Sequence, residues 1–245
     1  MRRNGLMRFG IAVFPGTWSD RDCKHAVELA GHEAVMLWHK DRGLQDVDCV
    51  ILPGGFSYGD YLRAGAVARF APLMESVAEF AEAGGLVWGI CNGFQILCEA
   101  HLLPGALTRN SSLEFRCAPA WLRVESTDAA FTSGCARGDV LQIPVSHGEG
   151  RYVADAETLD MLEREQRVAF RYVRRDGSPV QSDTPNGSMR DIAGIVNERR
   201  NVLGMMPHPE RACEAVLGSS DGMRLFNNVA QSMSRNGVMP VAAAS

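Results

Sequence analysis

A strongly apolar segment that ends at a cysteine most constrains how this chain can fold. Residues 86–90 read Leu-Val-Trp-Gly-Ile, which is typical of a buried strand, and Cys91 follows at once. Gly89 and Gly93 lie two residues either side of that cysteine, and a helix-compatible run begins at Phe94. Such glycines let neighbouring backbone pass close to a strained nucleophile at a strand-to-helix turn. The segment therefore predicts either an exposed catalytic thiol or a small buried cysteine.

Apolar strands and amphipathic helices alternate through the first hundred residues. Ser19 and Asp22 resemble a capping box at the start of the first helix. Because the strands are continuously apolar rather than alternating, they indicate a parallel sheet covered by helices on both faces. The expected strands lie at residues 8–14, 34–37, 48–52 and 86–90, and the expected helices at 20–29, 67–83 and 94–100.

From about residue 107 the pattern changes to strands separated by polar turns, which indicates antiparallel pairing. The expected elements are strands at 115–124, 140–145, 168–173, 192–196 and 202–205, and a last helix at 222–233. We therefore predict an α/β fold with a mostly parallel central sheet, flanking helices and an additional antiparallel β region. We expect one domain over residues 8–234, with terminal extensions at 1–7 and 235–245.

The composition excludes several classes of function. The 245 residues carry a formal charge of −4, which gives no basic surface for nucleic acid. No apolar stretch is long enough to cross a membrane, and residues 1–7 lack the apolar core of a signal peptide. The seven cysteines form no CxxC pair and no zinc-type spacing, so we expect reduced thiols in the cytoplasm and no metal site.

Three glycine- or proline-marked turns follow apolar strands, at residues 53–56, at Cys91 and at residues 207–210. The carboxyl ends of parallel strands share one edge of a sheet, so these turns are expected to converge there. His208 could then take the proton of the Cys91 thiol, and Glu210 could orient the imidazole. In an extended segment, side chains two residues apart point the same way, which favours a His208–Glu210 pair.

Backbone amides beside the cysteine are candidates for an oxyanion hole. One is the amide of Asn92, directly after the nucleophile. The other is the amide of Gly55 or of Phe56, and the sequence does not choose between these two.

The stretch Gly-Ile-Cys-Asn-Gly-Phe-Gln at residues 89–95, with His208 and Glu210, resembles the class I, or triad, glutamine amidotransferases. Such enzymes hydrolyse the side-chain amide of glutamine through a cysteine thioester and pass ammonia to a synthase. The resemblance also implies a flavodoxin-like fold. Further motifs resemble one branch of the family, the glutaminase subunits of phosphoribosylformylglycinamidine synthase. Those motifs lie at residues 54–66, 110–115, 146–152, 185–188, 192–195 and 204–211.

The resemblance implies a set of glutamine-binding residues. Gln95 would bind the α-amino or α-carboxylate end of the substrate. The same pocket would be lined by Asn110, Ser112 and the backbone around Ser146 and His147.

The resemblance also implies partners. These are the synthetase subunit of that synthase and a small accessory subunit, with Arg63 and the loop at 56–65 as candidate contacts. The chain contains no P-loop of the GxxxxGKS/T type, so ATP and magnesium are expected on the synthetase, and no cofactor is expected here.

Three alternatives remain open. Another cysteine-elbow α/β protein, such as a chaperone or peptidase, would not need Gln95 or the His208–Glu210 pair. A non-catalytic regulatory module would characteristically lack the nucleophile or the histidine. A glutaminase serving GMP, CTP or anthranilate synthesis is less consistent with the Gly-Phe-Ser-Tyr-Gly-Asp-Tyr motif at residues 55–61.

Overall fold

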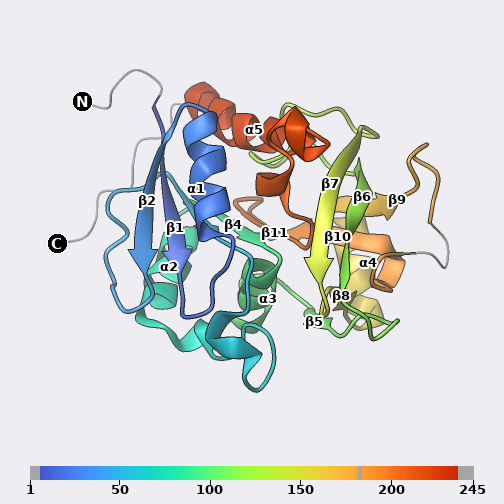
Figure 1. The fold of residues 1–245 in the computed structure, drawn as a ribbon, viewed down its shortest axis with the longest axis horizontal. Helices are drawn as coiled ribbons and strands as arrows, with labels where there is room; N and C mark the ends of the chain where they lie inside the picture. Colours follow the sequence, from blue (N-terminus) through green and yellow to red (C-terminus); the bar gives the residue numbers. More distant parts are fainter. Residues whose placement is uncertain (1–5, 181–183, 237–245) are drawn as a thin grey trace.

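The computed structural model describes residues 6–180 and 184–236, so the predicted terminal extensions lie largely outside it. Its strands are β1 (Arg8–Val13), β2 (Glu33–Trp38), β3 (Cys49–Leu52), β4 (Leu86–Ile90), β5 (Ala106–Thr108), β6 (Arg116–Val124), β7 (Val140–His147), β8 (Arg151–Val153), β9 (Val168–Val173), β10 (Ile192–Val196) and β11 (Val202–Met205). Within the described residues, nine of these strands form one sheet in the order β2-β1-β3-β4-β11-β10-β9-β6-β7 (Figure 1).

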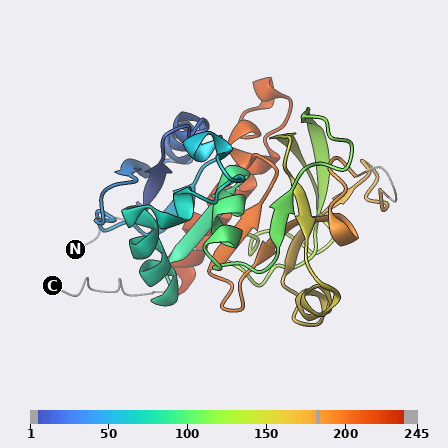
Figure 2. The same cartoon turned by 90° about the horizontal axis from the view of Figure 1, so that it is seen from below.

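The first half of this sheet is parallel. β2, β1, β3, β4 and β11 all run the same way. Helix α1 (Asp20–Leu29) covers one face, and α2 (Pro72–Glu82) and α3 (Asn92–Glu99) cover the other (Figures 1 and 2). Every residue of β3, β4 and β11 is buried, which confirms the interpretation of their continuous apolar runs.

The second half is antiparallel, and it extends the same sheet. β10 pairs antiparallel with β11, and β9, β6 and β7 follow in turn. The mixed α/β fold is therefore as predicted. Helix α5 (Asp221–Asn236) lies against β7 and beside α1. One continuous sheet therefore holds both β4, which precedes the Cys91 turn, and β7 at its antiparallel edge.

Helix α4 (Ala156–Arg164) was not predicted. Its signal was present, because Asp155 is a side-chain N-cap that accepts a hydrogen bond from the Thr158 amide at 2.7 Å. The short strands β5 and β8, which pair with each other outside the main sheet, were also missed.

Two local predictions were wrong. The helix expected over residues 67–83 is broken, because Pro72 holds Ala71 in an extended conformation, and a separate 3-10 turn occupies Ala68–Phe70. Phe70, which lies within the expected helix, is 73% exposed. The Ser19 hydroxyl makes no capping hydrogen bond, and accepts one from Arg211 Nη2 at 2.9 Å instead.

No helix in the described part of the chain combines the length and the apolar character needed to cross a membrane.

Candidate active site

Cys91 lies at a sharp turn between β4 and α3. Its backbone has φ 52° and ψ −107°, a left-handed conformation that a residue with a side chain rarely adopts. The Cys91 amide donates to the Met205 carbonyl at 2.7 Å, and the Cys91 carbonyl accepts from the Gln95 amide at 3.2 Å. The strained strand-to-helix turn predicted from the sequence is therefore present, and the strain is held by bonds to β11 and α3.

The two flanking glycines are needed for close approach of α3 to the sheet. A Cβ on Gly93 would overlap the carbonyl oxygen of Leu52 in β3. A Cβ on Gly89 would lie 2.5 Å from Leu97 Cδ1. Both positions exclude a side chain because of packing, even though neither requires a positive φ.

We expect Gly93→Ala to destabilise the protein, because the nearest obstacle is backbone that cannot rotate away. Overpacking of this kind costs roughly 1–3 kcal/mol, so thermal unfolding should shift down by several degrees. Gly43→Ala is the matched control, since nothing lies within 4 Å of the position that its added methyl group would take. Equal melting temperatures for the two variants would contradict the close approach of α3 to β3.

His208 and Glu210 form a buried pair. His208 Nδ1 lies 2.6 Å from Glu210 Oε1, and both side chains are almost inaccessible to solvent. The predicted pairing is present, but its expected cause was wrong. Pro209–Arg211 form a 3-10 turn rather than an extended segment, and the turn brings the carboxylate back to the imidazole.

The charge state of His208 follows from its neighbours. Burial lowers its pKa, but the Glu210 carboxylate and the Cys91 sulfur outweigh burial and raise the pKa to about 10. Nε2 of His208 is buried and has no hydrogen-bond partner among the described residues. An imidazolium beside the Cys91 sulfur is suited to protonating a leaving group.

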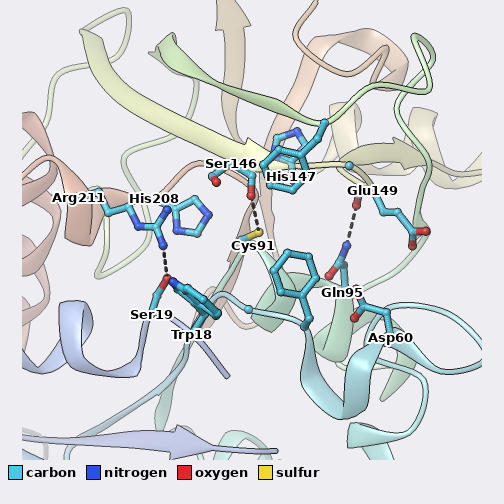
Figure 3. Close-up of a pocket in the computed structure, with 14 residues that line it drawn as sticks. Trp18, Ser19, Asp60, Cys91, Gln95, Ser146, His147, Glu149, His208 and Arg211 are labelled. Carbon is cyan, nitrogen blue, oxygen red and sulfur yellow. Dashed lines mark hydrogen bonds between the residues drawn. The ribbon is translucent and has the colours of Figure 1, made fainter. Parts of the chain in front are cut away.

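A cleft of about 430 Å³ opens beside Cys91 (Figure 3). The Cys91 thiol faces the Ser146 carbonyl, at 3.7 Å from Sγ to oxygen. Among the residues predicted from sequence, those that line the cleft are Gly55, Phe56, Cys91, Gln95, Ser146, His147 and His208.

Asn110 and Ser112 do not line this cleft. Asn110 is fully buried and holds the loop after β7, donating to the His147 carbonyl at 2.9 Å and accepting from the Gly150 amide at 3.0 Å. Ser112 is exposed, and its hydroxyl accepts from the Glu114 amide at 3.4 Å. In this structure Asn110 shapes the wall of the cleft from behind, and Ser112 lies outside it.

His147 is not suited to proton transfer. Burial, together with the charge of His208, lowers its pKa to about 3. Its Nε2 lies 3.1 Å from Nδ2 of Asn186, which donates to it. His147 therefore stays neutral and packs the wall of the cleft.

Comparison with known proteins places the chain in a family. A family model of CobB/CobQ-like glutamine amidotransferase domains matches residues 7–238. The chain belongs to this family. The phosphoribosylformylglycinamidine synthase subunit PurQ of Koribacter versatilis is 52% identical over 94% of this chain and 100% of the relative. The PurQ subunit of Streptomyces avermitilis is 56% identical over 91% of this chain and 96% of the relative.

Solved structures agree with this assignment. A chain of the PurLQS structure from Thermotoga maritima is 43% identical, with a TM-score of 0.83, covering 93% of this chain and 99% of that one. A putative GMP synthase subunit from Thermoplasma acidophilum, at 12% identity and a TM-score of 0.61, shares the fold over 94% of this chain and 95% of that one.

In this amidotransferase the two alternative oxyanion donors differ. The Phe56 amide already donates to the Gly16 carbonyl at 2.9 Å. The Gly55 amide has no acceptor among the hydrogen bonds of the described residues, and Gly55 lines the cleft. Of the two candidates, Gly55 is therefore the one free to bind an oxyanion in this conformation.

Seven further residues line the amidotransferase cleft without having been predicted. They are Trp18, Ser19, Asp60, Phe115, Gly148, Glu149 and Arg211. All of them except Trp18 and Ser19 lie within motifs that were recognised in the sequence, so a signal for them existed. Trp18 and Ser19 lie outside those motifs, and no catalytic pattern pointed to them.

Proposed function

We propose that this chain is the glutaminase subunit of phosphoribosylformylglycinamidine synthase. It hydrolyses the glutamine side-chain amide and delivers ammonia to a synthetase, which converts formylglycinamide ribonucleotide to formylglycinamidine ribonucleotide in de novo purine biosynthesis. The observation that carries the proposal is the buried His208–Glu210 pair beside Cys91 in a chain more than half identical to PurQ subunits over nearly its whole length.

In the first half of the reaction, the Cys91 thiolate attacks the amide carbon of glutamine. The carbonyl oxygen becomes an oxyanion, for which the Gly55 and Asn92 amides are the proposed donors. His208 then gives its proton to the amide nitrogen, the carbon–nitrogen bond breaks and ammonia leaves. A glutamyl thioester on Cys91 remains.

In the second half, neutral His208 takes a proton from water as that water attacks the thioester. The tetrahedral intermediate expels the Cys91 thiolate and releases glutamate, which restores the imidazolium–thiolate pair. Glu210 holds the ring and stabilises its charge in both halves. The sum is glutamine plus water giving glutamate plus ammonia.

The synthetase and a small accessory subunit are the proposed partners, and the PurLQS relative supports such an assembly. ATP and magnesium belong on the synthetase in this proposal. Within the described residues, no cluster of three or more His, Cys, Asp or Glu side chains could hold a metal ion. We place the reaction in the cytoplasm, where seven free thiols would stay reduced.

The loop after Gly55 is the proposed synthetase contact. Phe56, Tyr61 and Leu62 are 47%, 77% and 89% exposed. Tyr58, expected to join them, packs inward instead, with its hydroxyl 2.6 Å from His39 Nδ1. Arg63 is held by two hydrogen bonds to Glu99, at 2.5 and 2.6 Å, so the loop is tied down at its far end.

Steady-state glutamine hydrolysis, with and without the synthetase subunit, tests the proposal. We expect the free chain to be slow and the complex to be at least about tenfold faster, because docking on the loop would order the oxyanion donors at its start. Tyr61→Ala and Leu62→Ala should reduce this activation. Val216→Ala, exposed on a different segment, should not.

No glutamine-dependent amidation in the reconstituted complex would refute the proposed function. A free chain as fast as the complex would refute only the activation by docking.

A further inference from the structure

One end of the cleft is acidic. Asp60, Gln95 and Glu149 lie on one side of Cys91, whereas His208, Ser19 and Arg211 lie on the other (Figure 3). Glutamine must place its amide carbon at the sulfur, and its leaving nitrogen must face His208. The amino-acid end of the substrate therefore extends toward Asp60 and Glu149.

Asp60 has an unfavourable backbone conformation and an unpaired carboxylate oxygen. Its φ is 54°, and the two residues before it, Tyr58 and Gly59, also have positive φ values of 53° and 66°. Asp60 Oδ1 is shielded from solvent and has no hydrogen-bond partner among the described residues. A buried carboxylate oxygen without a donor is destabilising, and strained backbone of this kind concentrates at ligand sites. Both costs would be offset by a ligand that brings a donor.

Gln95 does not donate a hydrogen bond to Asp60, because both ends of its side-chain amide already have partners. Nε2 donates to the Glu149 carbonyl at 2.6 Å, and Oε1 accepts from Asn92 Nδ2 at 2.9 Å. These contacts fix the Glu149 backbone at the edge of the cleft. Gln95 therefore positions the acidic end.

The carboxylates of Asp60 and Glu149 interact electrostatically. Burial, and secondly the charge of Glu149, raises the pKa of Asp60 to about 6. Glu149 forms an ion pair with Arg109, 3.7 Å from Nε to Oε1, and the Arg109 side chain is 77% exposed. A pair of acids at one end of a cleft, with one oxygen unpaired, fits a ligand carrying a positive charge.

We propose that Asp60, supported by Glu149, binds the α-ammonium group of glutamine and thereby selects the free amino acid. The inference rests on the proposed function, since it names how the same site recognises its substrate. Amides that lack an α-ammonium group, such as glutaramate, and glutamine whose α-nitrogen is in a peptide bond would be rejected. Asp60 is thus a specificity-determining residue that makes no contact with the reacting bond.

The first experiment measures alkylation of Cys91 in the complex with the synthetase subunit. The diazoketone 6-diazo-5-oxo-L-norleucine carries an α-ammonium group, whereas iodoacetamide does not. Loss of one charge-assisted hydrogen bond corresponds to about a 10- to 100-fold change. Asp60→Asn should slow alkylation of Cys91 by the diazoketone by that factor, and should change the rate of alkylation by iodoacetamide less than about threefold. Glu149→Gln should act in the same direction, more weakly.

Glu114→Gln is the control, because this exposed acid lies outside the cleft and pairs with Arg116. It should change neither rate.

The second experiment compares kcat/KM for glutamine and for glutaramate. Asp60→Asn should reduce the preference for glutamine, mainly by raising KM for glutamine.

Equal slowing with both reagents in Asp60→Asn and Glu149→Gln, or slowing with neither, would overturn the proposal. Failure of the wild-type complex to hydrolyse glutamine would instead overturn the proposed function. The two failures are therefore distinguishable.

Discussion

Cys91→Ala should abolish glutamine-dependent synthesis by the complex, while synthesis from added ammonia persists. The alanine variant keeps the fold of the turn but has no atom that can form the thioester. Both rates are measured on the same preparation, so loss of the first alone locates the defect in ammonia production. The expected reduction is at least about 10³-fold, the scale on which covalent catalysis fails when its nucleophile is removed.

Cys98→Ala is the matched control for this result. Cys98 lies on α3 one to two turns beyond Cys91, is buried, and donates weakly to the Pro104 carbonyl at 3.8 Å from sulfur to oxygen. Burial raises the pKa of its thiol far above the usual range, so it is not a nucleophile. Its loss should leave both reactions nearly unchanged. Glutaminase activity retained by Cys91→Ala would show that Cys91 is not the nucleophile.

Removing His208 should produce the second largest effect, because in the proposed mechanism one imidazole serves as acid in the first half-reaction and as base in the second. We expect His208→Ala to lower kcat by roughly 10²- to 10⁴-fold. Glu210→Gln should cost less, since the ring can keep part of its orientation without the carboxylate. The double variant should be scarcely slower than His208→Ala, because residues that act as one unit are not additive.

A pH profile separates this role of Glu210 from a merely structural one. Because the carboxylate raises the pKa of His208, Glu210→Gln should move the alkaline limb of kcat to lower pH. Fully additive losses in the double variant, with an unchanged pH profile, would show that the two side chains do not share a catalytic function.

Local chemistry decides what could be predicted from the sequence. The turn at Cys91 was predictable because its requirements lie within five residues, from Gly89 to Gly93. The His208–Glu210 pair was predictable for the same reason, although the 3-10 turn that forms it was not. The helix break at Pro72 and the N-cap at Asp155 are also local signals, so both were predictable from the sequence.

The remainder of the site depends on segments that meet only after folding. Ser19 and Arg211 are 192 positions apart in sequence, yet they share a hydrogen bond at the rim of the cleft. Asn110 acts on a loop 37 to 40 residues away, so its side chain could be read as substrate-binding until its partners were known. Asp60 could be proposed as a substrate-binding residue only from its unpaired carboxylate oxygen and the nearby Glu149, which are features of the folded structure.

The insertion of β11 beside β4 has a consequence for synthesis of the chain on the ribosome. The strand that accepts the Cys91 amide, through Met205, is made more than a hundred residues after the cysteine itself. A product that terminates before residue 202 contains the nucleophile and most of the cleft, but lacks both the strand that holds the turn and the histidine that follows it. On the proposed mechanism, incomplete chains are therefore expected not to hydrolyse glutamine, and the activity is expected only from the finished polypeptide.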